Sequence, residues 1–141
     1  MGAAEHRDED RIRVLVCDDD QLFAEALSTT LSAEPQFEVV GVASDGREAL
    51  ELARGLAPVD VILLDIQMPR MDGIETLQAL RDWPQRPAVM MLTGIADTDV
   101  IERAQREAPD AFLRKSVDPD EVINGILIIR QMVRAAALAS T

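Results

Sequence analysis

The sequence is poor in cysteine, in aromatic residues and in positive charge. Its 141 residues include one cysteine, which excludes an internal disulfide framework. Lysine and arginine number 14 against 26 acidic residues, and a net charge of −12 repels phosphate backbones. The charged residues 1–11 exclude a signal peptide, and Arg130 interrupts the longest apolar run before it reaches membrane-spanning length. We therefore expect a cytoplasmic chain that itself binds neither membrane nor nucleic acid.

What remains is an ordinary globular composition, with 48% hydrophobic and 28% charged residues. The length suits one domain with its own core, which we place at residues 11–134. Residues 1–10 are predicted to be a flexible charged arm, and residues 135–141 the end of a helix or the start of a linker. Cys17 lies inside the first apolar run, which indicates a small buried side chain rather than a reactive thiol.

Apolar stretches and helical patterns alternate along the chain. The predicted strands are Ile12–Cys17, Phe37–Ala43, Val59–Asp65, Ala88–Thr93 and Ala111–Lys115. Five helical patterns lie between and after them, and the fourth is expected to extend to Ala108. This alternation predicts an α/β fold, a single doubly wound sheet of five parallel strands with helices on both faces.

Three acidic residues mark the expected helix starts. Asp20 is predicted to cap the first helix, and Asp118, followed by Pro119, to cap the last. Asp45 has Glu48 three residues later, the spacing of a capping box. These signals mark the expected starts of three of the five helices.

Carboxylates are concentrated where two strands end. Asp18 and Asp19 follow the first strand, and Asp65 ends the third. The carboxyl ends of parallel strands meet at one edge of the sheet, where ligands of open α/β sheets bind. Clustered carboxylates repel one another unless a cation neutralises them, and Mg²⁺ prefers such hard oxygen ligands. The sequence therefore predicts a magnesium site at this edge.

Two further strands end in residues that suit a phosphoryl group. The fourth ends in Thr93, a hydroxyl donor, and the fifth in Lys115, an ammonium. Phosphoryl transfer requires positioning and charge neutralisation more than covalent machinery. With the acids, these residues predict phosphoryl transfer with Asp65 as the nucleophile, giving an aspartyl phosphate.

The dispersed features together resemble a known family. Val16-Cys17-Asp18-Asp19, the loop from Asp65 to Gly73, Thr93 and Lys115 occur in the order found in CheY-like receiver domains of two-component response regulators. The Asp18–Leu27 stretch is most similar to receivers of the NarL/LuxR type. This resemblance implies the flavodoxin-like strand order 2-1-3-4-5.

The resemblance also implies a role for each matching residue. Asp65 would accept a phosphoryl group from a sensor histidine kinase, and Mg²⁺ would be held by Asp18, Asp19, Asp65 and the backbone carbonyl of Gln67. Thr93 and Lys115 would contact the phosphate. Thr93 and Phe112 would form the switch that changes the surface of the fourth helix, fifth strand and fifth helix. The chain would thus regulate an output domain or partner, in transcription, without being a turnover enzyme.

Two positions depart from the common pattern of the family. Ser116 follows Lys115 where many receivers have proline, so a cis peptide is not expected there. In the family, the residues two after the phosphoacceptor and two after the threonine influence dephosphorylation; here they are Gln67 and Ile95. We expect the bulky apolar Ile95 to hinder the attacking water and to lengthen the life of the phosphorylated state.

The last helix has a wide apolar surface. Val122, Ile126, Ile129 and Val133 are expected to face the sheet. Leu127, Ile128 and Met132 flank that stripe and indicate either a homodimer or docking face or a broad core contact. The kinase, the stimulus and the output target are not encoded in this segment.

Two other functions fit parts of the sequence. Asp18-Asp19-Asp20 also fits the Asp-x-Asp opening of haloacid dehalogenase-type phosphatases, with Asp18 as nucleophile and Asp20 as general acid. That alternative leaves the loop after Asp65 unexplained. A phosphorylation-independent interaction domain on the same fold is the third possibility.

Overall fold

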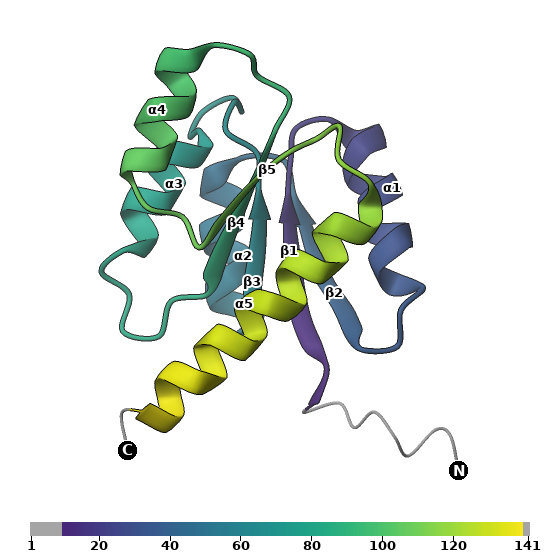
Figure 1. Cartoon of the computed structure of the whole chain (residues 1–141). Coiled ribbons are helices and arrows are strands. Elements are labelled where there is room, and N and C mark those ends of the chain that lie inside the picture. The colour runs from purple at the N-terminus through teal and green to yellow at the C-terminus, as the bar shows by residue number, and fades with distance from the viewer. Residues whose placement is uncertain (1–9, 140–141) are drawn as a thin grey trace.

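A computed structural model describes residues 10–139 of the chain, in which strands and helices alternate (Figure 1). The strands are β1 (Ile12–Cys17), β2 (Phe37–Ala43), β3 (Val61–Leu64), β4 (Ala88–Thr93) and β5 (Ala111–Arg114). The helices are α1 (Gln21–Ser32), α2 (Gly46–Gly55), α3 (Gly73–Leu80), α4 (Thr98–Arg106) and α5 (Pro119–Ala139). The strands form one parallel sheet in the order β2-β1-β3-β4-β5, as predicted.

Helices cover both faces of the sheet because its strands are apolar on both sides. Val14 and Val16 of β1 pack toward α1 and α5, whereas Leu15 and Cys17 pack toward α2, α3 and α4. Figure 1 shows α5 crossing one face diagonally beside α1, with the other helices behind the sheet. Burial of each large apolar side chain contributes about 1.5–3 kcal/mol, so the sheet is a rigid platform for the loops at its ends.

Some element ends differ from the prediction. β3 begins two residues later and ends one residue earlier than expected, and β5 ends at Arg114. The backbone nitrogen of Asp65 still donates to the Cys17 carbonyl at 2.9 Å, so Asp65 remains attached to the sheet. α4 ends at Arg106 rather than Ala108, because Ala108 adopts a left-handed backbone with φ of 54° before Pro109.

The predicted helix caps are present in the structure. The side chain of Asp20 accepts a hydrogen bond from the Phe23 nitrogen at 3.1 Å, and Asp118 accepts one from the Asp120 nitrogen at 2.9 Å. Asp45 accepts from the Glu48 nitrogen at 2.9 Å, but the Glu48 carboxylate accepts from the Ser44 nitrogen and not from the Asp45 nitrogen. Asp45 therefore caps α2 without a complete capping box, since the reciprocal bond joins Glu48 to the residue before the cap.

The inner stripe of α5 was only partly predicted. Val122, Ile126 and Ile129 are buried as expected, but Val133 is 53% exposed because α5 extends beyond the sheet. Ile123 is buried in its place and Leu127 is half-buried against the core.

Among residues 10–139, α5 alone is long and apolar enough to cross a membrane. The expectation that Arg130 interrupts any run of that length was therefore wrong. A core helix of a soluble protein passes the same test of length and composition. Residues 1–9 and 140–141, which include most of the predicted arm, lie outside the described part.

Candidate functional site

The site lies at the carboxyl edge of the sheet, the edge at which all five strands end. Register places Cys17 of β1 opposite Leu64 of β3, and Thr93 of β4 opposite Arg114 of β5. The residues that follow these strands therefore emerge side by side. This parallel register brings Asp18, Asp65 and Lys115 together from distant parts of the sequence.

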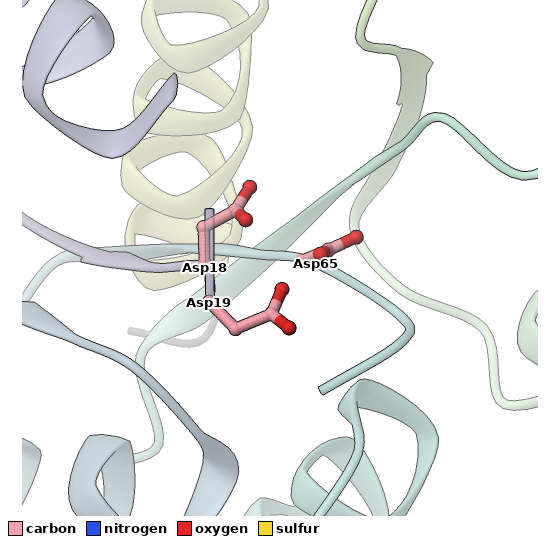
Figure 2. A group of neighbouring side chains, drawn as sticks. All are labelled: Asp18, Asp19 and Asp65. Atoms are coloured by element: carbon pink, nitrogen blue, oxygen red, sulfur yellow. The ribbon is translucent and has the colours of Figure 1, made fainter. Parts of the chain in front are cut away.

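Three carboxylates converge there. One oxygen from each of Asp18, Asp19 and Asp65 lies within 4.8 Å of the others. Figure 2 shows these three neighbouring side chains. Asp18 and Asp65 are buried, while Asp19 is exposed. Mg²⁺ takes carboxylate oxygens and keeps several waters, so a group with two buried acids and one open side fits this ion.

Lys115 is the cation of the group. Its Nζ lies 2.8 Å from Asp18 Oδ2 and 3.3 Å from Asp65 Oδ2. One ammonium neutralises only one of the three carboxylates, so the group retains negative charge. Burial lowers the pKa of Lys115, but the hydrogen bond to Asp18 and the charges of Asp65 and Asp18 outweigh it and leave the pKa raised. Lys115 is therefore charged at neutral pH.

Asp65 is the perturbed acid. Burial and the charge of Asp18 raise its pKa to about 6, although Lys115 and the hydrogen bond from the Ile66 nitrogen oppose the rise. The Ile66 nitrogen donates to Asp65 Oδ1 at 2.8 Å, which fixes the carboxylate and leaves Oδ2 toward Lys115. A carboxylate that is buried, oriented and still ionised at neutral pH has the properties of a nucleophile.

The β4 and β5 ends complete the edge. Thr93 is fully buried, and its hydroxyl oxygen accepts a hydrogen bond from the Ile95 nitrogen at 3.0 Å. Ile95 and Phe112 are half-buried and pack on the α2–α4 side of the core. The Lys115–Ser116 peptide is trans, as expected, since the one cis bond in residues 10–139 is Ala57–Pro58.

The loop after Asp65 is tightly closed. The Gly73 nitrogen donates to the Ile66 carbonyl at 2.7 Å, and a β-carbon on Gly73 would lie 2.1 Å from the Asp65 carbonyl oxygen. Asp72 caps α3 in a capping box with Glu75. Gln67 is exposed within this loop. Only glycine at position 73 permits this approach, which explains the Asp72-Gly73 pair that ends the loop.

Two residues of the site were not anticipated from the sequence. The ring of Phe23, which has the spacing of a core residue on α1, lies under Lys115 with 4.6 Å from Nζ to the ring centre. Arg70 has a left-handed backbone and forms an ion pair with Asp45. The neighbouring residues in the sequence gave no signal for either property.

Cys17 and Asp20 have the structural roles that the sequence predicted. Cys17 is buried as predicted, and burial, reinforced by Asp45, strongly raises the pKa of its thiol. Asp20 caps α1 and does not belong to the three-carboxylate group. The phosphatase alternative required Asp20 as the general acid, so the geometry disfavours it.

The sequence of this chain is similar to those of known proteins. A model of the response regulator receiver domain matches residues 14–127. The transcriptional regulatory protein DegU of Brevibacillus brevis is 35% identical over 130 residues, which are 90% of this chain and 53% of DegU. A protein-glutamate methylesterase/protein-glutamine glutaminase of Methanospirillum hungatei is 39% identical over 106 residues, which are 74% of this chain and 31% of the relative. The chain thus spans about half or less of these relatives.

A solved structure extends the similarity to three dimensions. The receiver domain of the response regulator NarL from Mycobacterium tuberculosis is 34% identical and superposes with a TM-score of 0.77, covering 84% of this chain and 94% of that one. This neighbour and DegU are of the NarL/LuxR type that the sequence resembled. The chain belongs to the receiver domain family of two-component response regulators.

Proposed function

We propose that Asp65 accepts a phosphoryl group from a phosphohistidine of a sensor histidine kinase. An oxygen of the Asp65 carboxylate forms a bond to phosphorus while the phosphorus–nitrogen bond to the histidine breaks. The departing imidazole nitrogen keeps the bonding electron pair and takes a proton. The observation that carries this proposal is the buried Asp65 carboxylate beside Asp18 and Lys115, with its pKa raised yet still below neutrality.

Asp18, Asp19, Asp65 and the backbone carbonyl of Gln67 would hold Mg²⁺. Two observations support this assignment. One oxygen from each of the three carboxylates lies within 4.8 Å of the others, and the Lys115 ammonium balances only one of their charges. When bound, the ion supplies charge neutralisation for the transferring group. Asp18 has the further role of holding the Lys115 ammonium at 2.8 Å, ready to pair with the phosphate.

Thr93 and Lys115 are proposed to bind the phosphoryl oxygens. For this, the Thr93 hydroxyl moves toward Asp65, and Phe112 turns into the space that it leaves. The role of Thr93 is supported by its position at the end of β4. Its hydroxyl oxygen accepts a hydrogen bond from the Ile95 nitrogen. The resulting change in α4, β5 and α5 is a shift between two packings, with a coupling of about 1–3 kcal/mol.

The output is proposed to be transcriptional, since the DegU and NarL relatives are transcriptional regulators of which the match to this chain covers 53% and 54%. We propose that α5 contacts a second copy or an output domain, because Ile128 and Met132 are 56% and 61% exposed. The chain acts in the cytoplasm, binds no membrane or nucleic acid through residues 10–139, and turns over no external substrate. The division at residues 11 and 134 stays a prediction.

The test is the intact mass after incubation with acetyl phosphate and Mg²⁺. We expect one phosphoryl group on the native chain and none on Asp65→Asn or in the presence of chelator. Asp60→Asn is the matched control, because Asp60 lies at the opposite end of β3, and it should still take up one group. An adduct on Asp65→Asn, or one formed without Mg²⁺, would contradict the proposal.

Continuous release of inorganic phosphate without a stable adduct would instead favour the phosphatase. Mg²⁺ binding by isothermal titration calorimetry separates the third alternative, an interaction domain that is never phosphorylated. A chain that binds no Mg²⁺ and takes up no phosphoryl group would belong to that class.

A further inference from the structure

The loop that follows Asp65 is tied to the β2–α2 junction by an ion pair. The Nε atom of Arg70 donates to Asp45 Oδ2 at 2.6 Å, and Arg70 Nη2 lies 2.6 Å from the same oxygen. Asp45 is buried, at 4% exposure, whereas the Arg70 side chain is 61% exposed. An exposed arginine thus covers a buried carboxylate, and both of its near nitrogens are used in the contact.

The Arg70 backbone lies in an unfavourable conformation within a tight turn, in which the Met71 nitrogen donates to the Pro69 carbonyl at 2.7 Å. Its φ is +65°, in the left-handed region, which costs about 1 kcal/mol for a residue other than glycine. Such a conformation persists only where surrounding contacts determine it. Two contacts meet at Arg70: the backbone bond across it from Met71 to Pro69, and the ion pair of its side chain with Asp45.

Asp45 also connects to the end of β1. Its backbone carbonyl accepts from Cys17 Sγ at 3.3 Å, and that sulfur lies 3.4 Å from Met68 Sδ in the loop after Asp65. The next residue, Gly46, donates from its nitrogen to the Met71 carbonyl at 2.9 Å. The Asp45–Gly46 corner therefore contacts both segments that carry the proposed metal ligands.

The two halves of Asp45 have separate tasks. Oδ1 accepts from the Glu48 nitrogen and caps α2, while Oδ2 binds Arg70. The hydrogen bond to Glu48 and the guanidinium of Arg70 lower the pKa of Asp45, so this carboxylate is ionised. Capping alone needs no ion pair, since an asparagine caps equally well. The capping of α2 therefore does not explain why Asp45 forms an ion pair with Arg70.

We propose that Arg70 and Asp45 are positioning residues that hold the 66–72 loop in shape and thereby set the affinity of the site for Mg²⁺. Neither residue belongs to the three-carboxylate group. They act through the backbone of the loop that presents Gln67. The inference rests on the proposed magnesium site and names the part of the chain that tunes it.

The sign of the expected effect separates positioning from electrostatics. Removal of a positive charge near a cation site strengthens cation binding by simple Coulomb attraction. Loss of loop geometry weakens it. Arg70→Gln should therefore raise the Mg²⁺ dissociation constant about five-fold, against the electrostatic expectation, when measured by calorimetry on the unphosphorylated chain.

Four further variants complete the experiment. Arg47→Gln removes an equal charge from an exposed residue of the same junction, and it should leave the affinity unchanged or slightly higher. Asp45→Asn keeps the α2 cap but loses the ion pair, and it should weaken binding as Arg70→Gln does. The double variant should bind no worse than either single one, because both break the same contact. Arg70→Lys should restore part of the affinity.

Hydrogen exchange provides a second readout. The Gly73 amide, which closes the loop on Ile66, should exchange faster in Arg70→Gln and not in Arg47→Gln. Unchanged Mg²⁺ affinity in Arg70→Gln, or equal weakening by Arg47→Gln, would overturn the inference while native binding remained intact. Failure of the native chain to bind Mg²⁺ would overturn the magnesium site itself, and the positioning role with it.

Discussion

The two edges of the sheet differ in how their carboxylates are balanced by positive charges. At the amino edge, Asp60 accepts a hydrogen bond from the Arg13 nitrogen at 2.8 Å and lies 3.6 Å from an Arg130 guanidinium. Asp110 accepts from the Val89 nitrogen and pairs with Arg86 in the same manner. At the carboxyl edge, Asp18, Asp19 and Asp65 share one lysine and two of them are buried.

The difference teaches how to separate structural charges from functional ones. Each amino-edge carboxylate has its own guanidinium and a backbone donor, so it is satisfied by the protein alone. The carboxyl-edge carboxylates exceed their counter-charge and are held in place by tight backbone contacts. Such an arrangement is destabilising until a ligand completes it, which is typical of binding sites.

The largest contrast is expected from a β-carbon added at each edge. Gly73→Ala places an atom 2.1 Å from the Asp65 carbonyl oxygen, so backbone must move, and we expect a loss of about 3 kcal/mol in unfolding free energy. Gly55→Ala, at the amino-edge end of α2, meets nothing within 4 Å and should stabilise by about 0.5–1 kcal/mol. Urea unfolding measures both; equal effects would show that the Asp65 loop is not tightly closed.

Neutralising one carboxylate at each edge should change stability in opposite directions. In chelator at neutral pH, Asp65→Asn relieves the buried charge and should stabilise by about 2 kcal/mol. Asp60→Asn loses an ion pair with Arg130 and should destabilise by about 0.5–1 kcal/mol. A destabilising Asp65→Asn would mean that Lys115 already compensates the site fully.

The stabilisation by Asp65→Asn should depend on pH. The folded pKa of Asp65 is about 6, above its ordinary value of 3.8, so the folded state favours the protonated form. Its contribution to stability is present below about pH 4 and is lost as pH rises through about 6. The difference in unfolding free energy between Asp65→Asn and the native chain should vanish at the acidic end and reach its full size near neutrality. Saturating Mg²⁺ should reduce it.

The smallest expected effect concerns Ile95, a large apolar side chain two residues after Thr93. If it hinders the attacking water, Ile95→Glu should shorten the life of the phosphorylated state several-fold, or about 1 kcal/mol in activation free energy. Loss of the phosphoryl mass over time, followed in parallel for both chains, measures it. Equal or slower loss in the variant would contradict the hypothesis, and Val133→Glu, far along α5, is a control that should match the native chain.

Local patterns predicted most of the architecture. Apolar runs predicted the bounds of β1, β2 and β4 to the residue, because most positions in these strands are apolar. Capping acids fixed the starts of α1 and α5. The ends of β3, β5 and α4 were less certain, since the last residues of an element take their conformation from neighbours such as Pro109. Val133 was misplaced because periodicity along a helix cannot say where the sheet beneath it stops.

The sequence by itself determined which side chains meet at the carboxyl edge of the sheet. A carboxylate, a hydroxyl and an ammonium that follow apolar strands must meet wherever parallel strands share an edge, so Asp18, Asp65, Thr93 and Lys115 could be assigned to one place in advance. Only the tertiary structure decided their state. The raised pKa of Asp65, the ring of Phe23 under Lys115 and the Arg70–Asp45 ion pair depend on burial and on distances between segments far apart in the chain. Those quantities exist only after packing has excluded water and fixed the loops, and no local pattern contains them.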